Sequence, residues 1–169
     1  MKLPANSQLP VLLVDVDGVI SLFGFHMDKR PAGAFLSVDG IPHYLSSTAG
    51  EHLRALSERF ELVWCTGWEE RANEYLPHAL GLPGPLHHLT FAGAPGGSDR
   101  HWKLDAIEAH VGPQWPLAWI DDDHDEGCQE WASQRPGPTL LLTTESPTGI
   151  TQRHVAELER WARALATDD

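Results

Sequence analysis

The stretch that decides the fold is Val11-Leu12-Leu13-Val14-Asp15-Val16-Asp17-Gly18. It opens with an apolar run rich in valine over residues 11–16, interrupted by Asp15, and it ends in Asp17 and Gly18. Such a run predicts a strand that is buried on both faces, as the strands of a parallel sheet are. While the chain stays extended, alternation directs Asp15 and Asp17 to the same side of the sheet.

Apolar runs and amphipathic segments alternate along the rest of the chain. Further strands are predicted over residues 61–65, 117–120 and 139–142, with a weaker one over 86–91. Helical spacing predicts helices over residues 48–60, 68–81, 101–110 and 151–165, and the pattern Asp123-x-x-Glu126 predicts the start of a short helix. The side chains expected to cap helices are Thr48, Ser98, Asp99, Asp123 and Thr151. This alternation predicts a single α/β domain over residues 1–169, with a Rossmann-like open parallel sheet and helices on both faces.

Residues 18–46 interrupt the alternation of strands and helices. A loop over residues 18–33 precedes a segment that alternates around Asp39-Gly40, a strong signal for a tight hairpin turn. We therefore expect residues 34–38 to pair with 41–45 as a flap that hangs over the strand ends. His43 and Tyr44 on this hairpin are candidates for contact with a substrate.

The 169 residues contain 12 Lys and Arg against 24 Asp and Glu, a formal net charge of −12. This charge disfavours non-specific binding to nucleic-acid backbones, which needs a positive surface. It still allows a local site that binds a single phosphate group. No apolar run approaches the ~20 residues that cross a bilayer, so we expect no membrane partner. The two cysteines, Cys65 and Cys128, make no disulfide framework, and without a signal-peptide pattern the expected location is cytoplasmic.

Chemically suggestive side chains follow the predicted strands. They are Asp15, Asp17, Thr66, Gly67 and the acids at 121–123, and Lys103 lies early in a helix. The carboxyl ends of parallel strands meet at one edge of a sheet, where ligands bind in such folds. Clustered carboxylates repel one another, and Mg²⁺, which prefers oxygen ligands, resolves the repulsion together with Lys103. Phosphoryl transfer needs a nucleophile, a metal ion, a cation and hydrogen-bond donors. These residues offer all four, with Thr66 supplying the donors.

In this order the motifs resemble those of the haloacid dehalogenase-like (HAD) superfamily. VLLVDVDGV resembles its first motif, LVWCT its second, Lys103 its third and LAWIDDD its fourth. The resemblance implies that Asp15 is the nucleophile that becomes an aspartyl phosphate. It implies that Asp17 is the general acid and base, with its backbone carbonyl on Mg²⁺, and that Thr66 and Lys103 bind the phosphate.

The fourth motif implies the remaining metal ligands. Asp121 ligates Mg²⁺ directly, and the second acid is Asp122 or, in the longer spacing of the motif, Asp125. The expected catalytic residues are Asp15, Asp17, Thr66 and Lys103, and the expected metal ligands are Asp15, Asp17, Asp121 and Asp122. Candidates for substrate contact are Thr66, Gly67, Trp68, Lys103, His43 and Tyr44, and Trp102 is a further candidate for the pocket wall.

The resemblance also bears on the substrate. Large cap domains in this superfamily are inserted between the first motif and the first helix, or between the second and third motifs. Here the first of these segments holds only a loop and a hairpin, and the second holds a helix, a short strand and a loop. This implies a capless enzyme with a flap. Capless relatives often act on bulky or macromolecular phosphorylated substrates. WCTGWEERANEYL and ITQRHVAELERW resemble a small HAD group associated with RNA-repair enzymes, which implies nucleic-acid ends as a possible substrate that the acidic charge disfavours.

Other interpretations fit less well. A response-regulator receiver places its phosphorylated Asp after a middle strand, and a toprim nuclease domain puts a lone Glu first. His87, His88 and His101 lack the spacing of a structural zinc site. The expected function is Mg²⁺-dependent hydrolysis of phosphate monoesters, with polynucleotide-end phosphatase or a non-catalytic phosphate-binding module as alternatives.

Overall fold

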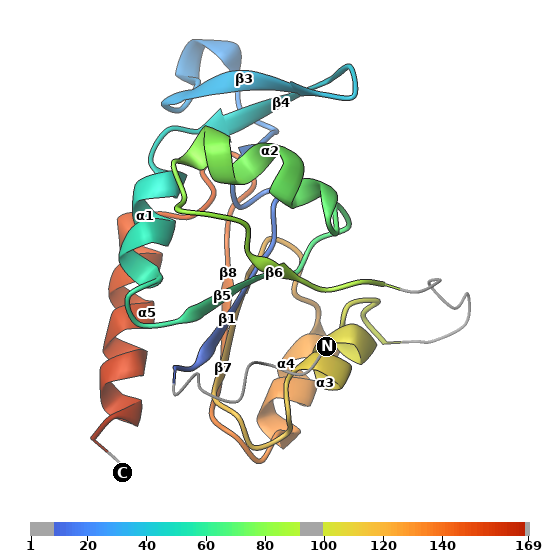
Figure 1. Cartoon of the computed structure of the whole chain (residues 1–169), viewed down its shortest axis with the longest axis vertical. Coiled ribbons are helices and arrows are strands. Elements are labelled where there is room, and N and C mark those ends of the chain that lie inside the picture. Colours follow the sequence, from blue (N-terminus) through green and yellow to red (C-terminus); the bar gives the residue numbers. More distant parts are fainter. Residues whose placement is uncertain (1–8, 92–99, 168–169) are drawn as a thin grey trace.

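The computed structural model describes residues 9–91 and 100–167 (Figure 1). Its central sheet has five parallel strands in the order β6-β5-β1-β7-β8. The strands are β1 (Val11–Val14), β5 (Glu61–Trp64), β6 (His87–His88), β7 (Leu117–Asp121) and β8 (Thr139–Thr143). Because β1 lies in the middle, between β5 and β7, it is buried on both faces, which confirms the prediction from its apolar run.

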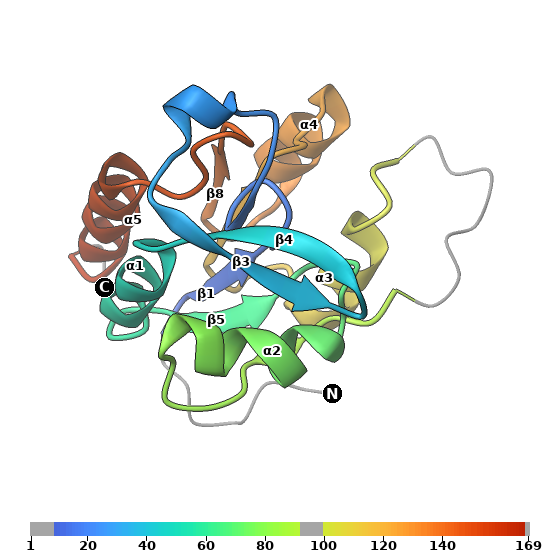
Figure 2. The same cartoon turned by 90° about the horizontal axis from the view of Figure 1, so that it is seen from above.

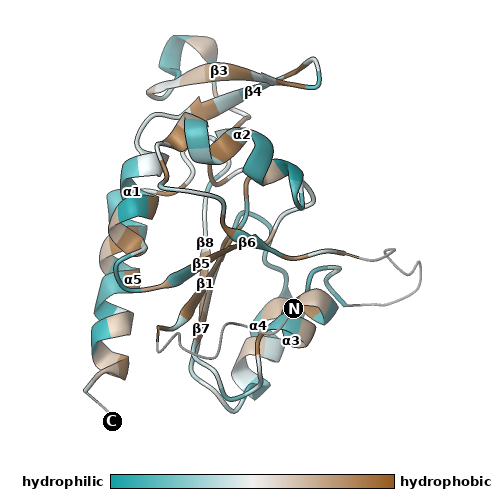
Figure 3. Cartoon of the chain, viewed as in Figure 1, coloured by the Kyte–Doolittle hydropathy of each residue, from teal (hydrophilic) through white to brown (hydrophobic). Residues whose placement is uncertain are grey.

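Helices cover both faces of the sheet. They are α1 (Ala49–Leu56), α2 (Arg71–Leu80), α3 (Leu104–His110), α4 (Glu126–Gln134) and α5 (Gln152–Leu165). Successive side chains of a strand point to opposite faces, so β1 supplies two cores. Leu12 and Val14 pack with α1, α2 and α5, while Val11 and Leu13 pack with α3 and α4. Figure 3 shows the resulting apolar strands between the two helical layers and confirms the predicted Rossmann-like α/β fold.

A second sheet forms the flap, which we define as residues 18–46. It is antiparallel, in the order β2-β4-β3, with β2 (Ser21–Leu22), β3 (Gly33–Val38) and β4 (Ile41–Ser46). Figure 2 shows β3 and β4 crossing above the central sheet. Asp39 and Gly40 both have positive φ, 50° and 81°, as a tight hairpin turn requires, so the predicted hairpin is confirmed. The predicted loop also contains β2 and the short helix η1 (Met27–Lys29), whose few residues carry no periodic signal.

Helix caps agree with the sequence in part. Thr48 precedes α1, but its backbone is already helical and its side chain makes no capping hydrogen bond, so the predicted side-chain cap at Thr48 is wrong. Thr151 does cap α5, and its backbone N–H donates to His154 Nδ1 at 3.0 Å. The expected caps Ser98 and Asp99 lie outside the described residues.

Several element boundaries differ from prediction. α2 begins at Arg71, after a turn at Trp68, and it runs through Pro77 to a left-handed Gly81 with φ of 63°. β6 keeps only two residues of the predicted strand over 86–91. None of the helices in the described ranges has the length and apolar character to cross a membrane.

Candidate active site

Most of the predicted site residues meet at the carboxyl edge of the central sheet. A cavity of about 240 Å³ is lined there by Asp15, Asp17, Thr66, Gly67, His101, Trp102, Lys103, Asp121, Asp122 and Asp123. The ends of β1, β5 and β7 supply most of this lining, as the parallel topology predicts. One small cavity therefore unites the four motifs that the sequence analysis picked out.

Lys103 is the buried cation of the cavity. Its side chain is only 3% exposed, and its Nζ lies 3.1 Å from Asp15 Oδ1 and 2.6 Å from Asp121 Oδ2. The backbone N–H of Val16 donates to the same Asp15 oxygen, Oδ1, at 2.8 Å. No residue that the structure describes donates a hydrogen bond to Asp15 Oδ2. One carboxylate oxygen of Asp15 is thus held in place while the other is available for reaction.

Asp121 ends β7 and is held by three donors. Its Oδ2 accepts the ammonium of Lys103 and, at 3.0 Å, the indole N–H of Trp119. Its Oδ1 accepts the backbone N–H of Asp123 at 3.1 Å. A buried carboxylate with this many partners keeps one orientation, which suits a metal ligand.

The structure distinguishes the two spacings of the fourth motif. Asp122 reaches the cavity, where its Oδ2 accepts the hydroxyl of Ser146 at 2.9 Å. It lies so close to Gly18 that a β-carbon there would collide with the carboxylate. Asp125 instead caps α4 and accepts the N–H of Cys128 at 2.8 Å. Asp122 therefore lies with Asp121 at the cavity and Asp125 does not, and the cap of α4 is Asp125 instead of the predicted Asp123.

Three of these acids have the geometry to hold a metal ion. Asp15, Asp121 and Asp122 each offer an oxygen, and the three atoms lie within 4.8 Å of one another. An all-oxygen donor set suits a hard divalent cation such as Mg²⁺. When all three carboxylates are ionised, Lys103 balances only one of their negative charges, and a further cation would be attracted. The Asp17 carboxylate is not part of this group.

Burial controls the charge of the cluster. It raises the pKa of Asp15 to about 7; Lys103 opposes this rise, and Asp121 adds to it. Burial also raises the pKa of Asp122. For Lys103, burial lowers the pKa, but the neighbouring carboxylates outweigh it and the pKa is raised above its usual value. Lys103 is therefore a permanent cation, whereas Asp15 is poised between its protonated and charged forms.

Sequence comparison places the chain in a known family. Residues 11–155 match the family described as the HAD domain in Swiss Army Knife RNA repair proteins. The chain belongs to this HAD family. The match spans every residue predicted for the site, and it confirms both resemblances stated from the motifs.

Two further comparisons complete this result. A hypothetical protein from Xanthomonas campestris, whose structure is solved, aligns with 15% identity and a TM-score of 0.47. The alignment covers 96% of this chain and 90% of that chain. No curated protein matches the sequence.

Thr66 follows β5 in the HAD domain as the second motif requires. It is buried, and its Oγ1 accepts the backbone N–H of Trp68 at 3.3 Å. Its hydroxyl proton is thus left to donate to another group, such as a phosphate oxygen. Gly67 lies next to it and near the edge of the Trp102 ring, and Trp102, which also lines the cavity, is 47% exposed.

Asp17 does not share the environment of Asp15. β1 ends at Val14 instead of residue 16, and the carbonyl of Val16 accepts the N–H groups of residues 19–21 in a tight turn. Both acids still line the cavity, as predicted, but their surroundings differ. Asp15 is buried, whereas the Asp17 side chain is 51% exposed.

Two predicted substrate contacts touch Asp17 instead of lining the cavity. Trp68 Nε1 donates to Asp17 Oδ2 at 3.0 Å, and His43 Nδ1 lies 3.7 Å from Asp17 Oδ1. The three side chains come from the turn after β1, the turn after β5 and the flap strand β4. They form a group at the edge of the HAD site.

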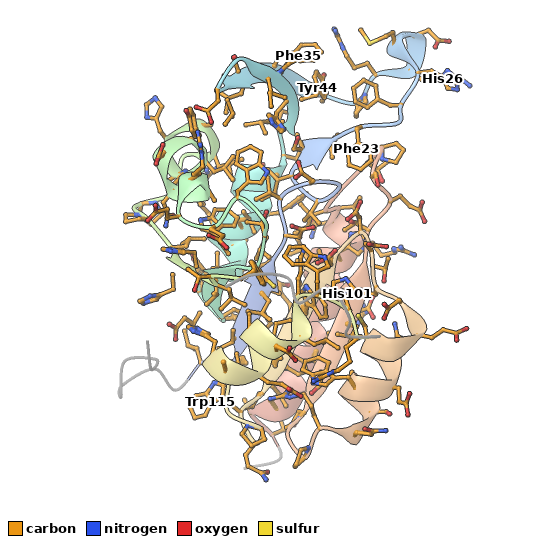
Figure 4. The ribbon with its side chains drawn as sticks, turned by 90° about the vertical axis from the view of Figure 1, so that its right-hand side faces the viewer. Phe23, His26, Phe35, Tyr44, His101 and Trp115 are labelled. Carbon is orange, nitrogen blue, oxygen red and sulfur yellow. The ribbon has the colours of Figure 1, made fainter. Side chains whose placement is uncertain are left out.

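Tyr44 is not brought to the site, in contrast to the prediction. Adjacent strand residues face opposite ways, so His43 turns toward Asp17 and Tyr44 away from it. The Tyr44 hydroxyl donates to the carbonyl of Pro31 at 2.6 Å, and its ring packs against Phe25 and Phe35. Figure 4 shows Tyr44 beside Phe35 on the flap, far from His101 of the cavity. Tyr44 stabilises the flap.

Two residues of the cavity wall, His101 and Asp123, are not among the predicted catalytic, metal-binding or substrate-binding residues. His101 is 9% exposed, and its Nδ1 accepts the backbone N–H of Lys103 at 3.3 Å. The only sequence signal for either residue is its place beside a motif residue. His101 lies outside the motifs, and Asp123 is the last residue of the fourth-motif stretch LAWIDDD without an assigned role in it.

Size alone does not select the site. A larger groove of about 570 Å³ runs between β6 and α3, lined in part by His87, His88 and His110. Its lining contains no carboxylate and no lysine. Only acid and cation together supply phosphoryl-transfer chemistry, so the smaller cavity is the candidate active site of the HAD domain.

Proposed function

We propose that this HAD domain is a Mg²⁺-dependent phosphohydrolase that cleaves phosphate monoesters through an aspartyl phosphate on Asp15. The observation that carries the proposal is the Asp15 carboxylate, with one oxygen fixed by Lys103 and Val16 and the other without a hydrogen bond from the described residues. Family membership supports hydrolase chemistry of this general type. The buried free thiols of Cys65 and Cys128 accord with a cytoplasmic location, which is part of the proposal.

In the first half of the proposed reaction, Asp15 Oδ2 attacks the phosphorus atom. The new O–P bond forms as the bond from phosphorus to the ester oxygen breaks, and Asp17 gives its proton to the leaving oxygen. Lys103 and the Thr66 hydroxyl bind the phosphate oxygens, on which negative charge is spread. The product alcohol leaves while the phosphoryl group stays on Asp15.

In the second half, water releases the phosphoryl group. Asp17, now ionised, takes a proton from the water as its oxygen attacks phosphorus. The bond between phosphorus and Asp15 Oδ2 breaks, which returns the carboxylate and frees inorganic phosphate. Because Asp17 is half exposed, water reaches it without opening of the core.

Asp15, Asp121 and Asp122 would hold Mg²⁺, which when bound neutralises charge on the phosphate and on the clustered carboxylates. Their oxygen-only donor set and the excess of negative charge fit that ion. Binding also favours the ionised form of Asp15, because a nearby cation opposes the effect of burial on its pKa.

A narrower candidate is phosphatase action on polynucleotide ends. It is favoured by the family description, which refers to RNA repair proteins, and by the exposed Trp102 ring beside the phosphate-binding residues. An exposed indole offers a surface on which a base can stack. The net charge of −12 opposes it, so contacts would be limited to the terminal nucleotides.

Release of inorganic phosphate from an aryl phosphate tests the proposal. We expect turnover with Mg²⁺, loss of turnover in excess chelator, and loss of several orders of magnitude in kcat for Asp15→Asn. A panel of nucleotides, sugar phosphates, phosphopeptides and phosphorylated RNA ends then identifies the substrate class. A protein that binds phosphate but hydrolyses no ester would be a non-catalytic module, and full activity in chelator would refute the metal requirement.

A further inference from the structure

Asp17 is a half-exposed carboxylate, which by itself would be free to rotate. It lies just after the turn at Val16, outside the ladder of the central sheet. A general acid must be within hydrogen-bond reach of the leaving oxygen, so rotation would weaken catalysis. Any neighbour that holds Asp17 therefore matters for the first half of the proposed reaction.

Trp68 is the first such neighbour. Its indole N–H donates to Asp17 Oδ2 at 3.0 Å, and its ring packs against the core on the α1, α2 and α5 side of the sheet. Its backbone N–H donates to Thr66 Oγ1, which ties the same residue to the phosphate-binding loop. The indole is thus a donor on a rigid support.

His43 is the second neighbour, and it comes from the flap. Its Nδ1 lies 3.7 Å from Asp17 Oδ1 and 3.0 Å from Ser21 Oγ. Its ring meets the Trp68 ring edge to face, with centroids 4.6 Å apart. Ser21 also forms a β-bridge with Asp17, so the flap contacts the acid through both side chain and backbone.

On the basis of the proposed function, we infer that Trp68 and His43 are positioning residues that aim Asp17 at the leaving group. Each Asp17 oxygen has its own nitrogen neighbour, one from the turn after β5 and one from flap strand β4. The flap therefore supplies one of the two side-chain contacts that orient the proton donor. This couples the flap to departure of the leaving group and leaves attack by Asp15 to the rigid sheet.

The dependence of kcat/KM on the basicity of the leaving group distinguishes positioning from a purely structural role. A purely structural role would not change this dependence. An alkyl phosphate releases a strongly basic alkoxide and needs the acid, whereas p-nitrophenyl phosphate releases a weakly basic phenolate and needs it little. The variants are Trp68→Phe, which keeps the ring but removes the N–H, and His43→Leu. kcat/KM for both substrates reports the first half of the reaction.

We expect each variant to lower kcat/KM at least about tenfold more for glycerol phosphate than for p-nitrophenyl phosphate. Asp17→Asn, which removes the acid itself, should give the largest difference between the two substrates. Trp131→Phe is the matched control. It removes a comparable indole bond, from Trp131 Nε1 to Glu108 Oε1 at 2.9 Å, away from the cavity. This control should change the two substrates equally.

The outcomes separate this inference from the proposed function. If the wild-type protein hydrolyses both esters and both variants lower the two values in parallel, positioning by Trp68 and His43 is refuted while the hydrolase remains. If the wild-type protein hydrolyses neither ester, the proposed function fails and this inference fails with it.

Discussion

Removal of the Lys103 ammonium tests the electrostatic account of the site. Lys103→Met keeps the length of the side chain but leaves Asp15 and Asp121 facing each other in a buried cluster. Loss of one partner of a buried ion pair costs about 3–5 kcal/mol of unfolding free energy, because the remaining charge is uncompensated. We expect a loss of that size in excess chelator at about pH 8, where Asp15 of the variant must either ionise against burial or take up a proton from dilute solution.

The pH dependence has a definite sign. In the wild-type protein the folded pKa of Asp15, about 7, lies above the ordinary 3.8, so the folded state holds this proton more tightly than the unfolded state. The Asp15 contribution to stability is therefore present at low pH and is lost as the pH rises through about 7. Without Lys103 the pKa of Asp15 rises further, because the attraction that opposed burial is gone. The cost of Lys103→Met should thus be smaller at about pH 5.5 than at about pH 8.

Urea unfolding at the two pH values, in chelator and then in excess Mg²⁺, measures these effects. Mg²⁺ should restore part of the lost stability, since Asp15, Asp121 and Asp122 still offer their oxygens. Lys29→Met is the control, because Lys29 is an exposed lysine of the flap and should cost less than about 0.5 kcal/mol. Equal losses for both lysines, or a Lys103 loss that does not vary with pH, would refute the reasoning.

Three further predictions concern the metal and the flap. Asp122→Asn should weaken Mg²⁺ binding in calorimetry at least about tenfold, whereas Asp125→Asn should leave affinity unchanged, because Asp125 only caps α4; equal losses would contradict the assignment. Mg²⁺ should support turnover and Ca²⁺ should not, since the larger ion accepts bidentate carboxylate and ties up the attacking oxygen of Asp15; equal turnover would contradict this. Shortening the turn at Asp39-Gly40 should alter KM and substrate preference more than the melting temperature, because the flap lies outside the central sheet; unchanged kinetics for every substrate would show that the flap has no role.

The central sheet and most of the site were predictable from sequence for a physical reason. A parallel strand buried on both faces must be continuously apolar, so β1 and β7 stand out from their surroundings. Parallel topology then brings Asp15, Thr66 and Asp121 to one edge, whatever the details of the loops. The order of the motifs alone was sufficient to predict which residues line the centre of the cavity.

Features that depend on a single local geometry were not predictable. Alternation shows that His43 and Tyr44 face opposite ways, but not which one faces Asp17, because that depends on how the flap packs. The turn at Val16 separates Asp15 from Asp17 and leaves no periodic signal. The choice between Asp122 and Asp125 required the register at which α4 begins.

The central claim is that Asp15 becomes phosphorylated during turnover, and trapping of that acyl phosphate tests it most directly. The protein is mixed with substrate and Mg²⁺, quenched into hydroxylamine, which converts an acyl phosphate to a hydroxamate, and digested for peptide mass spectrometry. We predict a hydroxamate on Asp15 in the wild-type protein that depends on both substrate and Mg²⁺ and is absent from Asp15→Asn. A hydroxamate on another carboxylate, or rapid turnover with unmodified Asp15 under these conditions, would contradict the account.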